Sequence, residues 1–254
     1  GGGGKKKKKK SNAREVMTIL RSSQKIRNLA LLVVGYGISH KLFEVAWKGQ
    51  LRALCPSPQA YGAVLGDVST WTGAVTIFLM IAGRYVFQHA GWAWAATATP
   101  LVMLVAGGTF FGLSLTGTSL VGGATGAKVA WVAAQAGMVT QVFARASKYS
   151  LFDPAKEMVY IEMGKEEKTK GKAAVDLVGS QIGKSGASLL NQALLLTMGS
   201  MSASLPIVAG VFGVCIVLWL NAVRQLNANL IAEGGINEPK SEGKPTLLGR
   251  LMGA

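Results

Sequence analysis

Charged residues are scarce in this 254-residue chain: Asp, Glu, Lys and Arg make up 15% of it, against about 25% in typical soluble domains. Apolar residues make up 50%, and the mean hydropathy is +0.34. This composition excludes a disordered tail, a collagen-like fibre and a disulfide-stapled scaffold, and it argues against an ordinary soluble domain. The long apolar stretches instead predict a membrane protein.

Cysteine and histidine are also rare, with two of each. Cys55 and Cys215 are far apart in the sequence and have no metal or redox spacing, and His40 and His89 fall in different apolar stretches. The sequence contains no nucleophile elbow and no catalytic pair of carboxylates. We therefore do not expect an enzyme, a metal site or a cofactor.

Long apolar stretches are abundant, and hydropathy predicts six transmembrane helices, each near the ~20 residues that a bilayer requires. We expect an all-α integral membrane domain over residues 27–225, between a basic low-complexity N-terminal arm (1–26) and a C-terminal tail (226–254). Pairs of small residues such as Gly179 and Gly183 would allow close helix crossings. The predicted spans are 27–54, 66–87, 91–115, 119–144, 173–199 and 203–223.

Basic residues are distributed very unevenly about these spans. Of the 27 Lys and Arg residues, 22 fall on one side, four fall within spans, and Arg52 alone falls on the other side. The positive side is expected to be the inner side, so both termini and the loop 145–172 are predicted to be internal. The run from Lys5 to Lys10 is interpreted as a disordered arm, with electrostatic contact with anionic lipid as the added alternative. Because a nucleic-acid partner would rest on this run alone, we expect none.

Three charged residues in the first predicted span share one helical face. Lys41, Glu44 and Lys48 follow an i, i+3, i+7 spacing. An ionisable residue at the centre of a membrane helix costs ~3 kcal/mol or more, so each is a functional candidate. Two interpretations are open: the residues form a self-neutralising ladder of ion pairs, or they line a polar cavity with Glu44 between two cations.

The fifth predicted span carries a polar stripe that includes Asp176, Gln181, Lys184 and Ser185. Such a stripe cannot face lipid, so it must face water or another helix. Lys184 is the best candidate in the chain for meeting an anionic substrate, although it could instead pair with Asp176 or with a carboxylate on another helix. In the fourth span, Lys128 either has a functional role or extends its ammonium group to the nearby membrane surface.

Several long sequence words carry a family resemblance. They include Glu44–Leu51 (EVAWKGQL), Ser147–Met158 (SKYSLFDPAKEM), Lys170–Asp176 (KGKAAVD) and Gly183–Gly186 (GKSG). In this order, over residues 27–225, they resemble the plastid and intracellular-bacterial ATP/ADP translocases, which are nucleotide transport proteins. The residues of the loop word that we single out are Ser147, Lys148, Tyr149, Asp153, Lys156 and Glu157.

The resemblance implies exchange of ATP for ADP across a membrane, without hydrolysis. It implies a major-facilitator-like transporter of twelve helices, with two six-helix halves around one alternately exposed site. The resemblance covers the second half of that architecture. Charged residues within the family's spans matter for transport, and here they map to Glu44 and Lys184. The implied location is the plastid inner envelope, with a bacterial inner membrane as the alternative.

Two functions remain open from the sequence. The chain is the C-terminal half of a nucleotide antiporter, working with a missing half, a separate half-chain or a second copy; or it is a structural subunit of a larger membrane complex without transport activity. Gln181, which stands where we expect an arginine in the family's pattern, favours the second. A mitochondrial-type carrier would need three repeats with a Pro-x-Asp-x-x-Lys/Arg word, and the sequence contains no such repeat.

Overall fold

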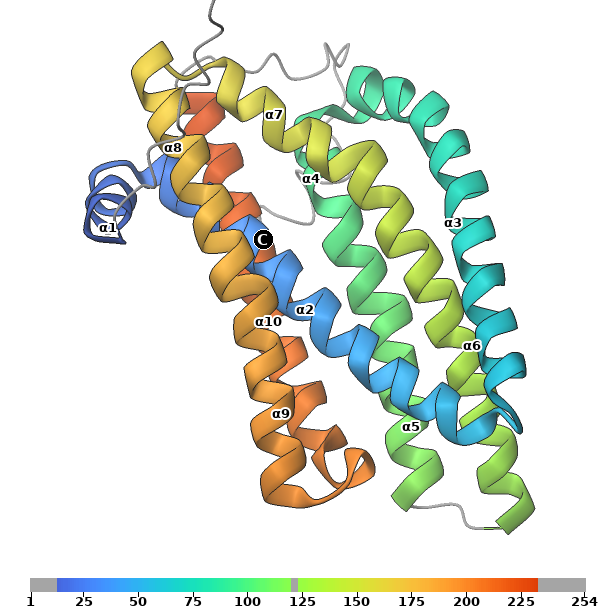
Figure 1. Cartoon of the computed structure of the whole chain (residues 1–254). Helices are drawn as coiled ribbons and strands as arrows, with labels where there is room; N and C mark the ends of the chain where they lie inside the picture. The colour runs from blue at the N-terminus through green and yellow to red at the C-terminus, as the bar shows by residue number, and fades with distance from the viewer. Residues whose placement is uncertain (1–12, 120–122, 233–254) are drawn as a thin grey trace, which may run out of the picture.

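Helix α2 (Gln24–Leu54) lies at the centre of the molecule, between α10 on one side and α6 on the other (Figure 1). The computed structural model describes residues 13–119 and 123–232, which are almost entirely helical; the Lys5–Lys10 run lies outside these ranges. The helix begins at Ser23, whose hydroxyl accepts a hydrogen bond from the amide of Ile26.

Three helical stretches of the described ranges are long and apolar enough to cross a membrane. This agrees with the expectation of an all-helical membrane protein. The longest, with 60 residues, folds back on itself at Gly91, whose φ of 81° favours glycine, and its first helix, α3, runs beside α6 (Figure 1). The three stretches are Gln24–Leu54, Pro58–Gly117 and Ala203–Ala232.

The second predicted helix begins earlier than its apolar pattern indicated. Helix α3 (Pro58–Tyr85) begins eight residues before the predicted start at 66, because the Ser57 hydroxyl accepts from the Ala60 amide and Pro58 suits the first helical turn. Polar and small residues in these first two turns lower the local hydropathy. After α3 the chain continues through η1 (Val86–Ala90), α4 (Gly91–Val102), η2 (Met103–Gly107), α5 (Gly108–Ser119) and α6 (Gly123–Ser147), where η denotes a π-helical segment.

The predicted inner loop 145–172 is mostly helical rather than an irregular solvated segment. Its high charge suggested solvation, but the charged side chains cover one face while α7 buries Ala155, Val159 and Tyr160 on the other. The indole Nε1 of Trp92 donates to the Ala155 carbonyl oxygen at 2.8 Å, which docks α7 on α4. This region comprises the end of α6, η3 (Lys148–Phe152), α7 (Asp153–Ile161) and the first part of α8 (Lys165–Val178).

The ends of the membrane domain also differ from their predicted boundaries. Helix α1 (Ala13–Ser22) occupies part of the expected arm, and α10 (Met201–Ala232) extends into the expected tail. Val16 of α1 and Leu230 of α10 are both buried, so apolar packing continues beyond the six predicted spans. Between α8 and α10 the chain forms η4 (Gly179–Gly186) and α9 (Ala187–Met198).

The backbones of α2 and η4 meet directly at two glycines. A Cβ atom at Gly37 would lie 2.9 Å from the Cα atom of Gly183 and 3.1 Å from its carbonyl carbon. Small residues allow such close helix crossings, as the Gly179/Gly183 pair predicted. By contrast, a Cβ atom at Gly66 on α3 would meet no heavy atom within 4 Å.

This difference predicts opposite effects for two glycine-to-alanine changes. Gly37→Ala should lower the free energy of unfolding by about 1–3 kcal/mol, because two backbones must move apart. Gly66→Ala should leave it unchanged or raise it by up to about 1 kcal/mol, since alanine is the better helix former. Thermal unfolding of both variants in the same detergent provides the measurement, and equal effects would contradict the close crossing.

Burial of Tyr160 makes a second prediction. Its hydroxyl has no hydrogen-bond partner among the described residues, and burial raises its pKa, with further contributions from the Asp176 and Glu157 carboxylates. The unfolded chain would therefore ionise Tyr160 first, and stability would fall as pH rises above about 10. Tyr160→Phe removes this effect, so its stability advantage over the natural chain should widen between pH 9 and 11, roughly. The measurement is denaturant unfolding of both chains across this pH interval. A difference in the free energy of unfolding that stays constant with pH would refute the prediction.

Candidate functional site

A cavity of about 720 Å³ opens between α2, the junction of α6 with η3, and the junction of η4 with α9. Basic and aromatic side chains dominate the part contributed by α2, α6 and η3, while η4 and α9 contribute hydroxyl groups. The cavity therefore offers positive charge and hydrogen bonds within an apolar bundle. Its lining consists of Tyr36, Gly37, His40, Lys41, Glu44, Arg145, Lys148, Tyr149, Ser185, Ser188 and Leu189.

The Glu44 carboxylate is the centre of the charge arrangement. Its Oε1 atom accepts from Lys48 Nζ at 2.8 Å and from Arg145 Nη2 at 3.0 Å, and its Oε2 atom accepts from Lys41 Nζ at 3.4 Å. The Glu44 side chain is only 14% exposed, whereas its three partners are 29–39% exposed. One carboxylate thus holds three cations from two helices, leaving an excess of positive charge beside the cavity.

Aromatic rings form one side of the cavity. The Tyr36 ring stacks on the His40 imidazole with centroids 5.2 Å apart and planes 10° apart. The Lys148 ammonium nitrogen lies 5.5 Å from the Tyr36 ring centroid and 4.4 Å from that of Tyr149, within the range of cation–π attraction. Lys148 also donates to Asp153 Oδ2 at 2.7 Å, which fixes its direction.

A smaller cavity of about 190 Å³ adjoins the first and shares Tyr36, Gly37 and Lys148 with it. Asp153, Lys156 and Asp176 also line this cavity, and Lys156 Nζ lies 3.9 Å from Asp153 Oδ1. The structure therefore brings part of the inner-loop word to the same place as the charged face of α2.

Some of the predicted site residues lie elsewhere. Lys128 is exposed near the opposite end of α6, and Gln181 is exposed on η4 and lines neither cavity. The π-helical turns of η4 change the angular position of successive residues, so the stripe expected from α-helical spacing is not kept. Ser147 is buried and bonds the Phe143 carbonyl at 2.7 Å. Glu157 pairs with Lys172 at 2.9 Å at the surface of the bundle.

Lys184 lies in η4, directly after Gly183, which contacts Gly37 of the cavity lining, but its side chain is outside the part of the chain that the structure describes. Its place on the backbone is next to Ser185, which lines the larger cavity. Its role therefore remains a prediction from the sequence.

Sequence reasoning missed Arg145, Tyr36, His40 and Gln141. Arg145 was assigned to the loop, but it lies in the last turn of α6, one turn after Gln141. Gln141 is fully buried, and neither atom of its amide has a hydrogen-bond partner among the described residues. A polar residue one helical turn before a cation was the available signal for a polar face on α6.

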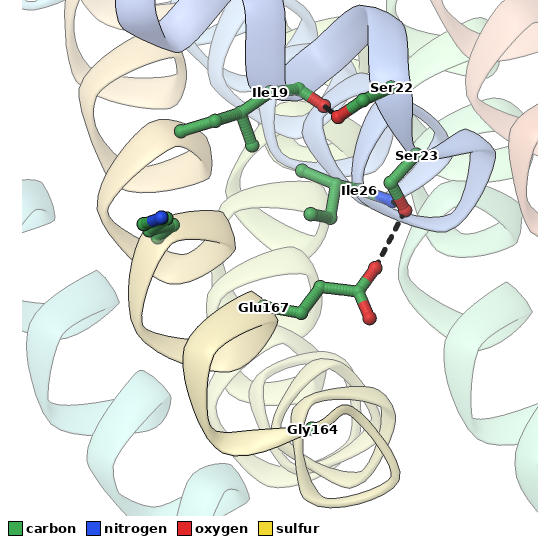
Figure 2. Close-up of a pocket in the computed structure, with 7 residues that line it drawn as sticks. Ile19, Ser22, Ser23, Ile26, Gly164 and Glu167 are labelled. Carbon is green, nitrogen blue, oxygen red and sulfur yellow. Dashed lines mark hydrogen bonds between the residues drawn. The ribbon is translucent and has the colours of Figure 1, made fainter.

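A separate pocket of about 530 Å³ lies between α1, the start of α2 and α8 (Figure 2). Ser23 Oγ donates to Glu167 Oε1 at 2.9 Å across it, which ties the start of α2 to α8. Lys170 also lines this pocket. Among the residues that the structure describes, no group of His, Cys, Asp and Glu is arranged to hold a metal ion, here or in the two cavities.

An all-helical bundle with membrane-length apolar stretches and a cation-lined interior cavity is the architecture of a membrane transport protein. A sequence profile described as "TLC ATP/ADP transporter" matches residues 3–230. The chain belongs to this family.

The relatives include plant and bacterial proteins. The chain is 44% identical to the "Plastidic ATP/ADP-transporter" of Solanum tuberosum over 84% of its own length and 34% of the relative's. It is 43% identical to "ADP,ATP carrier protein 1, chloroplastic" of Arabidopsis thaliana, over 90% of this chain and 36% of the relative. It is 40% identical to "ADP,ATP carrier protein 1" of Chlamydia muridarum, over 88% of this chain and 43% of the relative. The chain thus spans well under half of these relatives, and no solved structure matches it.

The ion pairs of Glu44 predict a large stability difference between two Glu→Gln variants. Glu44→Gln leaves three cations close together without their carboxylate, so the free energy of unfolding should fall by about 2–4 kcal/mol. Glu157→Gln is the matched control, because its pair with Lys172 is exposed and should contribute less than about 1 kcal/mol. Chemical unfolding in detergent measures both, and a Glu44→Gln effect no larger than the control would contradict the arrangement.

Proposed function

We propose that the chain is the C-terminal six-helix half of a nucleotide antiporter that exchanges ATP for ADP. Family membership supports nucleotide transport, and the observation that carries the assignment to a site is the cavity in which Glu44 holds three cations. A polyphosphate is the ligand that such an excess of positive charge favours. Transport requires no bond to be broken, so the absence of a catalytic residue set in the sequence is consistent with it.

We assign each of the six proposed spans to helices of the structure. α6 and α8–η4–α9 are not among the three stretches that are apolar enough to cross a membrane by composition, and both carry charged residues, such as Lys128 and Arg145 on α6. In a major-facilitator-like arrangement, polar helices of this kind face the other half of the transporter. The six spans are α2, α3, α4–η2–α5, α6, α8–η4–α9 and α10, within the proposed membrane domain 27–225.

In the proposed mechanism, nucleotide phosphates compete with Glu44 for its cations. The guanidinium of Arg145 can hold a phosphate with two parallel hydrogen bonds, whereas Lys41 acts as a point charge. When the phosphates leave, Glu44 takes the cations back, so the empty cavity is not left with unbalanced charge. Lys184 adds a further positive charge from η4, and Ser185 adds a hydroxyl group. Lys148, Asp153 and Lys156 of the loop, together with Asp176 of α8, would close the inner end.

We infer that the second half of the site comes from another six-helix unit: a separate half-chain, a second copy or a larger membrane complex. The chain spans well under half of its relatives' length, as expected if another unit completes the site. Plant and chlamydial relatives point to the plastid inner envelope, with a bacterial inner membrane as the alternative. We expect no cofactor and no nucleic-acid partner.

The test is uptake of labelled ATP into proteoliposomes that contain ADP or are empty. The chain is reconstituted alone and together with the N-terminal half of the Solanum tuberosum relative. Uptake should require internal ADP and should fall about ten- to a hundredfold in Lys184→Ala, since a charge-assisted hydrogen bond contributes ~1.5–3 kcal/mol. Lys128→Ala, a lysine remote from the cavity, should retain full uptake.

Two results would reject the proposed function. Uptake that is independent of internal ADP would exclude exchange. No uptake in either reconstitution, from protein shown to be folded and inserted, would favour a structural subunit without transport activity.

A further inference from the structure

Four arginines at one end of the bundle differ from the cations of the cavity. Arg21, Arg27, Arg84 and Arg224 are exposed, and none forms an ion pair or hydrogen bond with a residue in the described ranges. By contrast, each cation on the charged face of α2 and α6 has a carboxylate partner. The four arginines come from four different helices, α1, α2, α3 and α10.

Each arginine lies where an exposed apolar surface ends. Arg27 is one turn before the exposed Leu31 of α2, and Arg84 is one turn after the exposed Ile81 of α3. Exposed apolar residues on membrane helices face acyl chains, so the arginines lie at the level where headgroups begin. On the other two helices, Met17 lies one turn before Arg21 and Val217 lies two turns before Arg224, and both are exposed.

The sequence around Arg21 and Arg27 is strongly basic. Residues 1–27 contain ten Lys and Arg but one acidic residue, Glu15. This end of the bundle, which carries α1, α7 and α8 in Figure 1, is the inner side in the proposed orientation. Each Lys or Arg near an anionic leaflet raises the affinity of the protein for that surface about fivefold. A guanidinium also suits a phosphate better than an ammonium does, because it donates two parallel hydrogen bonds.

We propose that Arg21, Arg27, Arg84 and Arg224 form a belt that binds the phosphate headgroups of anionic lipids in the inner leaflet. The lipid supplies a negative charge for each of these arginines, which have no carboxylate partner among the described residues, and its acyl chains cover the adjacent apolar side chains. The proposal rests on the orientation given above but not on nucleotide transport, and its test contains no nucleotide.

The test compares the melting temperature of the full chain in nanodiscs of phosphatidylcholine, with and without phosphatidylglycerol. The natural chain should melt about 3 °C or more higher with the anionic lipid. The variant Arg27→Gln/Arg84→Gln/Arg224→Gln should lose most of this gain. Arg52→Gln is the matched control. Arg52 is an exposed arginine at the opposite end of the same helix, α2, but it lines a pocket with Cys55 and Tyr61 instead of ending an exposed apolar surface, so the variant should leave the gain intact.

Three single variants, Arg27→Gln, Arg84→Gln and Arg224→Gln, keep the test decisive if the triple variant does not fold. Each should lose part of the gain while melting like the natural chain in phosphatidylcholine alone. A gain that survives in every single variant, or that Arg52→Gln abolishes equally, would overturn the proposal. An equal gain from inorganic phosphate in phosphatidylcholine would also overturn it, since it would show a free-anion site rather than a lipid belt.

Discussion

The carboxylate of Glu44 is the group on which the arrangement of the cavity depends. Three cations from α2 and α6 lie near one another within the bundle, and without a negative charge they would repel. Charges removed from water are tolerated only when they are paired and hydrogen-bonded. Glu44 meets this requirement with only two oxygen atoms, so its partners remain open to a competing anion that brings more negative charge.

The neighbouring helices hold this charge cluster in place through apolar packing and close backbone contact. Trp47, one turn along α2 from Glu44, donates from its indole to the Ala134 carbonyl oxygen at 2.9 Å and fixes α2 against α6. On the other side, Gly37 and Gly183 bring α2 and η4 into contact. The cavity thus lies between two rigid crossings, and π-helical segments form its edges on η3 and η4. Such segments are rare and occur frequently at functional sites.

The sequence predicted the helical membrane class and the charged face of α2, because apolar length and i, i+3, i+7 spacing are local properties. It did not predict that Arg145 joins Glu44, since that contact connects residues 101 positions apart. The stripe of α8–η4–α9 was predicted only in part: Ser185 lines the cavity, but Gln181 does not, because π-helical turns cannot be read from composition. The burial of Tyr160 was hidden by the many charges around it in the sequence.

The central claim is that Glu44 and Arg145 bind each other strongly across two helices, and a double-mutant cycle tests it most directly. Free energies of unfolding are measured for the natural chain, Glu44→Gln, Arg145→Gln and the double variant. The account predicts a coupling free energy of about 1–3 kcal/mol, with the double variant less destabilised than the sum of the single variants. Additive effects within about 0.5 kcal/mol would contradict it, because they would show that the two groups do not depend on each other.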